Sequence, residues 1–190
     1  MKKLIGITGK ARAGKDAFAE ALIRRGYQRL AFADALKQAT ALIADEDVGP
    51  YHDDIAKEQV IPRFDLTRRA ALQSVGSLAR EVFGGAVWTS RIIRGWQASG
   101  ESPAVITDCR FANEAQAIRD AGGIVVRITR PDNVGLTGSA AAHESEQGIP
   151  DDLVDVEVTN DGTLGELHHE ARKVFDFVAM HSAEQLGMDL

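Results

Sequence analysis

The chain of 190 residues has a single cysteine, Cys109, and therefore cannot form a disulfide within itself. A lone cysteine is typical of proteins from a reducing compartment. No apolar run approaches the roughly 20 residues that a membrane-spanning helix needs. The apolar run near the N-terminus is also too short for a secretory signal peptide. These absences predict a cytoplasmic protein that does not enter a membrane.

Positive charge is scarce as well, because the formal net charge is −6. This balance argues against a broad surface for extended nucleic acid. A local group of arginines can still bind small phosphates, since the field inside a pocket need not follow the net charge. No cluster of cysteines and histidines has the spacing of a zinc site, and His143-Glu144 has no second ligand pair beside it. We therefore expect a protein that binds small phosphorylated molecules rather than zinc or an extended polyanion.

The chain does contain apolar segments that alternate with helix-forming ones, and 44% of its residues are hydrophobic. Asp34 is expected to cap the second helix, residues 45–64 to be an irregular connection, and residues 131–152 a short lid-like loop. Such alternation, with nearly continuous apolar strands, indicates a parallel sheet covered by helices on both faces. We expect strands at residues 3–8, 27–32, 103–107, 124–129 and 154–159, and helices at residues 17–25, 35–44, 67–83, 87–98, 114–121 and 164–186.

A glycine-rich motif lies between the first expected strand and the first expected helix. Gly9 and Gly14 frame four residues and Lys15 follows, which is the G-x-x-x-x-G-K spacing of a P-loop. Its glycines allow successive N–H groups to point at phosphate oxygens, and the following helix adds its positive end. The predicted ATP-binding loop comprises Gly9, Lys10, Ala11, Arg12, Ala13, Gly14, Lys15, Asp16 and Ala17.

The loop departs from the usual pattern directly after its lysine. Asp16 and Ala17 stand where a Ser or Thr hydroxyl normally ligates Mg²⁺. A carboxylate can ligate the metal, directly or through water, and the alternative is that Asp16 only caps the helix. Asp108, at the end of the third expected strand, is a second candidate for Mg²⁺, with helix capping as its alternative. We expect Asp16 and Asp108 to share the metal.

Arginines supply the other candidate phosphate contacts. Arg110 follows Asp108 by two residues and is expected to point toward the transferred phosphate, unless it pairs with Asp108 or Glu114. The helices at residues 67–83 and 87–98 contain five arginines, and the planar guanidinium suits phosphate. We expect only one or two of these to be functional: Arg68, Arg69, Arg80, Arg91 and Arg94. Lys37, Gln73 and Trp88 are weaker candidates for the acceptor site, and His168 and His169 are expected to be solvated.

Together these segments resemble the phage-type deoxynucleoside monophosphate kinases. The similar pieces follow the family's order over nearly the whole chain, and only the P-loop is specific by itself. The Gly-Lys-Asp form of the loop is common in this family, although a Ser or Thr often occupies the position that Ala17 has here. The pieces are residues 9–16, 32–37, 72–77, 107–114, 121–123, 129–131, 143–146 and 159–163.

The resemblance implies a P-loop NTPase fold of three layers, with a parallel five-stranded sheet, a helical acceptor-binding region at about 35–100 and a short lid within one domain, 1–190. It implies Arg130 over the nucleotide, and Asn160, Asp161 and Gly162 beside the adenine. The catalytic set becomes Lys15, Asp108, Arg110 and Arg130, with Asp34, Lys37, Arg69, Gln73, Arg80 and Trp88 at the acceptor. The protein would work in the cytoplasm of the host if phage-encoded.

The reaction expected from this set is transfer of the γ-phosphoryl group of ATP to a (deoxy)nucleoside monophosphate, with Mg²⁺ as cofactor. Two alternatives stay open. One is a P-loop kinase for another phosphorylated acceptor, of the phosphomevalonate or dephospho-coenzyme A type. The other is a nucleotide-binding switch module without transfer. A homodimer is compatible with this size, but no apolar stripe marks an interface.

Overall fold

The computed structural model describes residues 4–131 and 148–185. The chain forms two compact units. The larger comprises Met1–Leu30 and Ile93–Leu190, and the smaller comprises Ala31–Ile92. The expected lid falls largely on residues 132–147 and, with His143-Glu144, lies outside the described residues. No helix within the described ranges is long and apolar enough to cross a membrane.

The larger unit contains a sheet of five strands in which every neighbouring pair runs parallel. Its strand order is β2-β3-β1-β4-β5, so β1 is central. This arrangement confirms the predicted α/β fold with a parallel five-stranded sheet. The strands span Leu4–Thr8 (β1), Gln28–Leu30 (β2), Ala104–Ile106 (β3), Ile124–Thr129 (β4) and Val156–Thr159 (β5).

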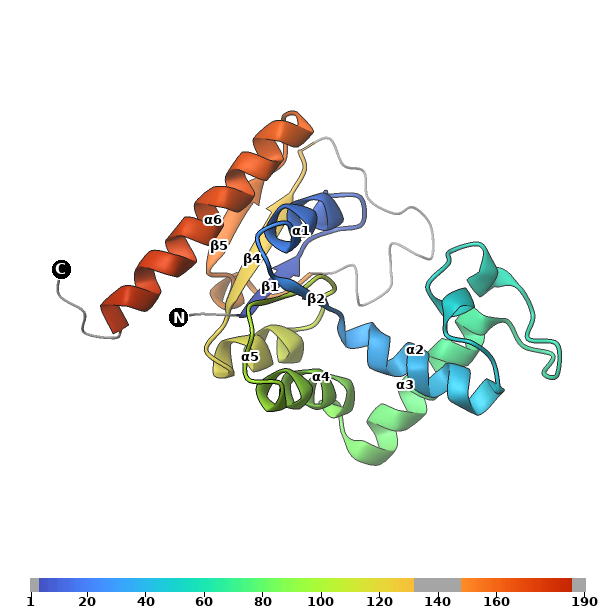
Figure 1. Ribbon diagram of the computed structural model, residues 1–190. Coiled ribbons are helices and arrows are strands. Elements are labelled where there is room, and N and C mark those ends of the chain that lie inside the picture. The colour runs from blue at the N-terminus through green and yellow to red at the C-terminus, as the bar shows by residue number, and fades with distance from the viewer. Residues whose placement is uncertain (1–3, 132–147, 186–190) are drawn as a thin grey trace. The chain divides into compact units, whose positions relative to one another are not determined.

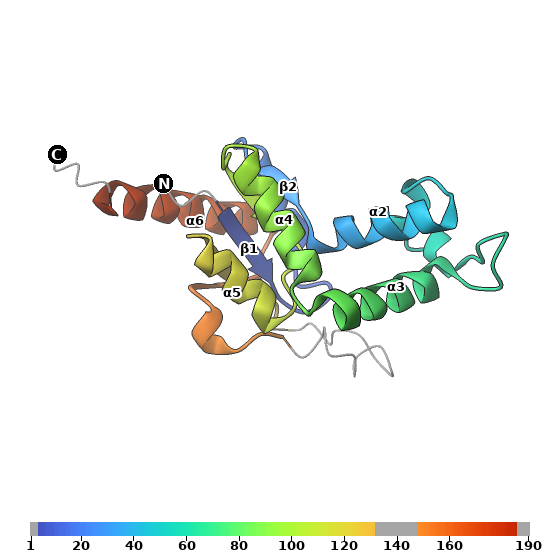
Figure 2. The ribbon, with the colours of Figure 1, turned by 90° about the horizontal axis from the view of Figure 1, so that it is seen from below.

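Helices cover both faces of this sheet (Figures 1 and 2). Helices α1 (Lys15–Ile23) and α6 (Leu164–Gln185) pack together on one face, where Ile5 and Ile7 share their core cluster. Gly6, which lies between Ile5 and Ile7 in β1, faces α5 (Ala112–Asp120) on the opposite face of the sheet, because alternate residues of a strand point to opposite faces. A Cβ at Gly6 would lie 2.3 Å from Cδ1 of Ile118, so a glycine there allows α5 to pack closely.

The smaller unit is helical. It contains α2 (Phe32–Ala44), two short 3₁₀ turns, η1 (Gly49–Tyr51) and η2 (Ala56–Glu58), and α3 (Arg68–Phe83). Helix α4 (Val87–Ala98) begins in the smaller unit and ends in the larger one. The hydrophobic core of the smaller unit is modest and consists of Ala41, Ala44, Tyr51, Ile61 and Ala71.

A buried ion pair supports this modest core. Arg68 donates to Glu46 from Nε at 2.9 Å and from Nη2 at 2.5 Å, and the Tyr51 hydroxyl donates to Glu46 at 2.9 Å. Hydrogen bonding from Arg68 holds the pKa of Glu46 below its usual range. Burial, followed by the Glu46 carboxylate, raises the pKa of Tyr51 to about 12. The guanidinium of Arg68 is therefore engaged in the fold of the smaller unit.

Most predicted elements are confirmed, with small shifts at their ends. The second strand is shorter than expected, and the third and fifth also lose residues at their ends. The prediction that Asp34 caps the second helix is wrong. Helix α2 begins at Phe32, with Ala31 at the cap position, so Asp34 lies inside the first turn. There its negative charge still interacts favourably with the helix dipole.

Candidate active site

The glycine-rich loop connects the central strand β1 to α1, as its motif requires. Gly9 has φ 139° and Gly14 has φ 102°, both in the region that favours glycine. A Cβ at Gly9 would lie 2.2 Å from the carbonyl oxygen of Ile128 in β4. The first glycine is therefore required by backbone angle and by contact with the neighbouring strand.

Lys15 folds back over this loop. Its Nζ donates to the carbonyl oxygens of Gly9 at 2.6 Å and Lys10 at 2.8 Å. The ammonium group is thus fixed at the loop, where it presents a point charge to a bound phosphate. Asp16 is exposed in the first turn of α1, and Gly14 occupies the cap position without a side-chain hydrogen bond. Asp16 therefore does not cap the helix.

Asn160 fixes the position of the loop from the other side. Its side-chain Nδ2 donates to the carbonyl oxygen of Ala13 at 2.9 Å, and its backbone N–H donates to Thr129 at 2.7 Å. The residue is buried, and its Nδ2 would lie 2.5 Å from a Cβ at Gly14. Asn160 thus ties the loop to the ends of β4 and β5, a role that the sequence did not suggest.

The polar residues after the strands gather at the carboxyl edge of the sheet. In the sheet register, Gly6 pairs with Ile106, and the backbone N–H of Cys109 donates to Ile7 at 3.2 Å. Asp108 is half-buried in this segment next to β1. Because β4 also pairs with β1, Arg130 follows the strand on the opposite side. The edge therefore places a carboxylate and a guanidinium on strands that flank the loop.

The segment after Asp108 is shaped by Glu114. Its Oε2 accepts hydrogen bonds from the backbone N–H groups of Arg110 at 2.7 Å and Phe111 at 3.1 Å. Phe111 occupies the cap position of α5, so Asp108 is not the helix cap. Glu114, three residues after the cap, has the spacing from which this contact could have been predicted.

Two arginines near this edge of the sheet have no acidic partner among the described residues. Arg12 and Arg130 are exposed, and neither makes an ion pair with any residue that the structure describes. Arg12 adopts φ 64°, a left-handed conformation that is uncommon outside glycine. An unpaired guanidinium on a nucleotide-binding loop is free to contact phosphate oxygens.

Cys109 has no chemical role at this edge. It is buried, as predicted, and burial, then the nearby Glu114 and Asp108 charges, raise the pKa of its thiol well above the usual range. The thiol therefore stays protonated at neutral pH and is a poor nucleophile.

Asp16 and Asp108 fit a magnesium ion of the kind that accompanies ATP. Mg²⁺ in such sites is bound by one or two carboxylates together with phosphate oxygens and waters. The described residues contain no cluster of three or more acidic, histidine or cysteine ligands, such as an all-protein cage would need. The two aspartates near the loop have the chemistry that a phosphate-bound Mg²⁺ requires.

The predicted acceptor residues lie in the smaller unit. Lys37 Nζ is 3.6 Å from Asp34 and 3.3 Å from the His52 ring, and Arg69 pairs with Glu58. Asp34, Lys37 and His52 form one charged group on α2 and the turn after η1, while the Arg69–Glu58 pair joins α3 to η2. Gln73 and Arg80 are exposed on α3, and Trp88 is half-buried.

A parallel sheet whose central strand ends in a glycine-framed lysine loop defines a P-loop nucleotide-binding protein. The family model described as deoxynucleotide monophosphate kinase matches residues 68–171. An Acanthamoeba polyphaga mimivirus protein described as a deoxynucleotide monophosphate kinase is 32% identical over 186 residues, covering 88% of this chain and 93% of that protein. This chain belongs to the deoxynucleotide monophosphate kinase family, and is therefore a phosphotransferase.

Further comparisons agree with this assignment. The deoxynucleotide monophosphate kinase of Escherichia phage RB69 is 34% identical over 70 residues, which cover 37% of this chain and 27% of that protein. Dephospho-CoA kinase from Campylobacter jejuni superposes with TM-score 0.53 and 15% identity, covering 93% of this chain and 97% of that one. TT1252 from Thermus thermophilus gives TM-score 0.50 and 20% identity, covering 91% and 96%. At these identities the solved structures show a shared fold alone.

Proposed function

We propose that this chain transfers the γ-phosphoryl group of ATP to a deoxynucleoside monophosphate and releases the diphosphate. The observation that carries the proposal is the loop of residues 9–16, with Lys15 fixed over two of its carbonyls, in a chain of this kinase family. The acceptor oxygen is already anionic, so no strong general base is needed. Catalysis then consists of positioning and of neutralising charge.

The donor half of the reaction uses residues of the larger unit. Lys15 and the loop N–H groups hold the phosphates of ATP. Arg12 and Arg130 add positive charge beside these phosphates, because no carboxylate among the described residues pairs with them. Arg110 follows Asp108 and neutralises the transferred group. Asn160 keeps the loop in place through Ala13, while Asp161 and Gly162 border the adenine.

Magnesium completes the donor half. Asp16 and Asp108 would hold it, directly or through water. Held there, the ion would supply positive charge that offsets the charge developing on the transferred phosphate. Because Ala17 offers no hydroxyl, these carboxylates take a larger share of metal binding than in a loop with Ser or Thr after the Lys-Asp pair.

The acceptor half uses the smaller unit. Arg69, Gln73 and Arg80 lie one turn or two apart on α3, and this spacing places them along one helix face. Asp34 and Lys37 have the same relation on α2, and Trp88 supplies an aromatic ring for the base. Arginine is suited to the monophosphate because its fork matches two phosphate oxygens.

An acceptor panel tests this function. Purified protein is assayed with ATP and Mg²⁺ against each deoxynucleoside monophosphate, the ribonucleotides, dephospho-coenzyme A and phosphomevalonate. We expect ADP release to depend on at least one deoxynucleoside monophosphate. Dependence on dephospho-coenzyme A or phosphomevalonate alone would reassign the acceptor, and slow ATP hydrolysis that no acceptor accelerates would leave only a switch module.

A further inference from the structure

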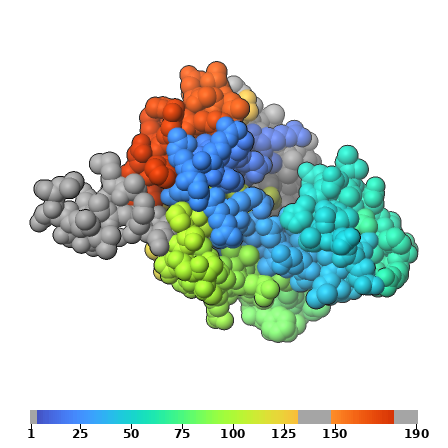
Figure 3. Space-filling model, in the orientation of Figure 1, coloured from blue at the N-terminus to red at the C-terminus, as the bar shows by residue number. Residues whose placement is uncertain are grey.

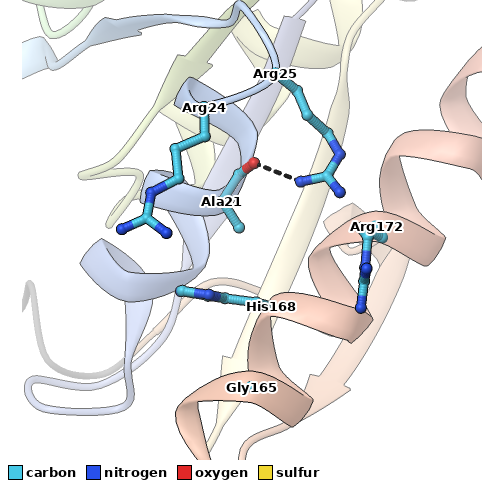
Figure 4. A pocket seen from close by; sticks show the side chains of 6 residues that line it. All are labelled: Ala21, Arg24, Arg25, Gly165, His168 and Arg172. Atoms are coloured by element: carbon cyan, nitrogen blue, oxygen red, sulfur yellow. Dashed lines mark hydrogen bonds between the residues drawn. The ribbon is translucent and has the colours of Figure 1, made fainter.

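A pocket of about 320 Å³ opens between α1 and α6 (Figure 4). Its lining comes from α1, the two residues that follow it, and α6: Ala21, Arg24, Arg25, Gly165, His168 and Arg172. Figure 3 shows the surfaces of the two helices side by side on one face of the molecule. Helix α6 starts at Leu164, so Gly165 lies beside the turn proposed for adenine, whereas Arg172 lies eight residues along the helix, about 12 Å beyond that start. The arginine end of the pocket, at Arg25 and Arg172, therefore lies away from the proposed nucleotide sites.

Two of its guanidinium groups lack a carboxylate partner among the described residues. Arg25 donates to the carbonyl oxygen of Ala21 at 2.9 Å and lies 6.0 Å from the Phe175 ring centroid. Arg172 Nη2 is 3.3 Å from Nδ1 of His169. Arg24, in contrast, pairs with Glu20. Two uncompensated positive charges at one pocket make its field positive although the chain as a whole is acidic.

His168 adds a second observation. Its ring extends from α6 toward Ala21 of α1 in Figure 4. Nε2 of this ring is covered from solvent, yet it makes no hydrogen bond with any described residue. Covered polar atoms nearly always have a partner, and a turn of this ring toward the pocket would let a ligand oxygen supply one. The prediction that His168 is solvated is wrong for this nitrogen, while His169 is exposed as predicted.

We propose that this pocket binds the phosphate group of a small phosphorylated molecule. Arg25 follows the end of α1 and Arg172 lies on α6, so a phosphate between them would accept hydrogen bonds from both guanidinium forks. The volume is at the lower end of small-molecule sites, which favours a compact phosphoanion over a bulky ligand. Such a ligand would join α1, which begins at the loop, to α6. The site goes beyond the proposed kinase reaction and does not depend on it.

Calorimetric titration with inorganic pyrophosphate tests the site. The starting protein is the Lys15→Met variant, whose loop is weakened, so that binding elsewhere is easier to see. We expect saturable binding to this variant. Adding Arg25→Gln and Arg172→Gln should weaken it by about tenfold or more, since two charge-assisted contacts are lost. Adding Lys173→Gln, which removes one charge from α6 at its pair with Glu170, should leave it unchanged.

Three results would overturn the proposal: no saturable binding, binding that ignores the two arginines, or equal weakening by Lys173→Gln. Should the double substitution fail to fold, histidine NMR of the Lys15→Met protein decides. The His168 ring signals should shift on adding pyrophosphate, and unchanged signals would also reject the site. Because all titrations begin from a loop variant, they can succeed or fail whether or not the chain proves to be a kinase.

Discussion

The two units differ in how their polar groups are used. In the larger unit, the phosphate loop presents mainly backbone N–H groups, whereas in the smaller unit, Ala31–Ile92, charged side chains pair with one another. In the loop, the positive φ angles of Gly9 and Gly14 and the hydrogen bonds of Lys15 define the backbone path. Arg12 and Arg130 have no ion pairs among the described residues. In the smaller unit, Arg68 binds Glu46 and Arg69 pairs with Glu58. Similar positive charges therefore have different surroundings: Arg12 and Arg130 are available for the proposed ligand binding, whereas Arg68 stabilises the smaller unit.

The largest expected effect of any single change is on turnover, from Lys15→Met. We expect a loss of roughly 10²–10³-fold or more, because a preorganised charge at the phosphates disappears. Stability should fall by only about 1 kcal/mol, since the lost hydrogen bonds go to half-exposed carbonyls. Steady-state rates and urea unfolding measure the two quantities. Lys173→Met, an exposed lysine on α6, is the control, and a comparable loss of rate there would break the comparison between binding and structural charges.

Arg68→Met should give the largest loss of stability, about 3 kcal/mol, because it leaves the largely buried Glu46 carboxylate without its cationic partner. Arg63→Met is the matched control, since Arg63 also pairs with a carboxylate, Asp45, but on the surface. That change should cost at most about 1 kcal/mol. Urea unfolding with a probe in the smaller unit measures both. Equal effects from the two variants would contradict a structural role for Arg68.

Asn160→Ala should cost about 1–2 kcal/mol, because the carbonyl oxygen of Ala13 loses its donor in a buried position. The loop also becomes less ordered, so KM for ATP should rise. Asn160→Asp keeps the size but replaces the donor with an acceptor, and we expect it to be at least as harmful. An Asn160→Asp protein with normal stability and normal KM would show that the loop does not depend on this anchor.

The smallest expected effect is the acid sensitivity of the smaller unit. The pKa of Glu46 is lowered in the folded protein by Arg68, so its stabilisation is present above the unfolded-state pKa, near 4.5, and is lost as pH falls toward the folded-state value. Glu46→Gln should therefore flatten the dependence of stability on pH below about 4.5. Unfolding curves at successive pH values measure this slope, and an unchanged slope would exclude Glu46 as its source.

The sequence predicts the backbone-built loop and sheet of the larger unit better than it predicts the side-chain contacts. The loop was predictable because glycine spacing, strand and helix all require the same backbone path. The sheet was predictable because its strands are continuous apolar runs. The Arg68–Glu46 pair joins residues 22 positions apart in the smaller unit, and no local pattern specifies such a contact. Likewise Asn160 reaches Ala13 across 147 positions, a distance that only the folded sheet closes.

The most direct test of the central claim is transfer of label from ATP labelled in its γ-phosphate, in a single turnover with one deoxynucleoside monophosphate and Mg²⁺. The wild-type protein should place the label on the deoxynucleoside diphosphate, and the Lys15→Met protein should not within the same time. Label found only in inorganic phosphate, or equal transfer by both proteins, would contradict the account.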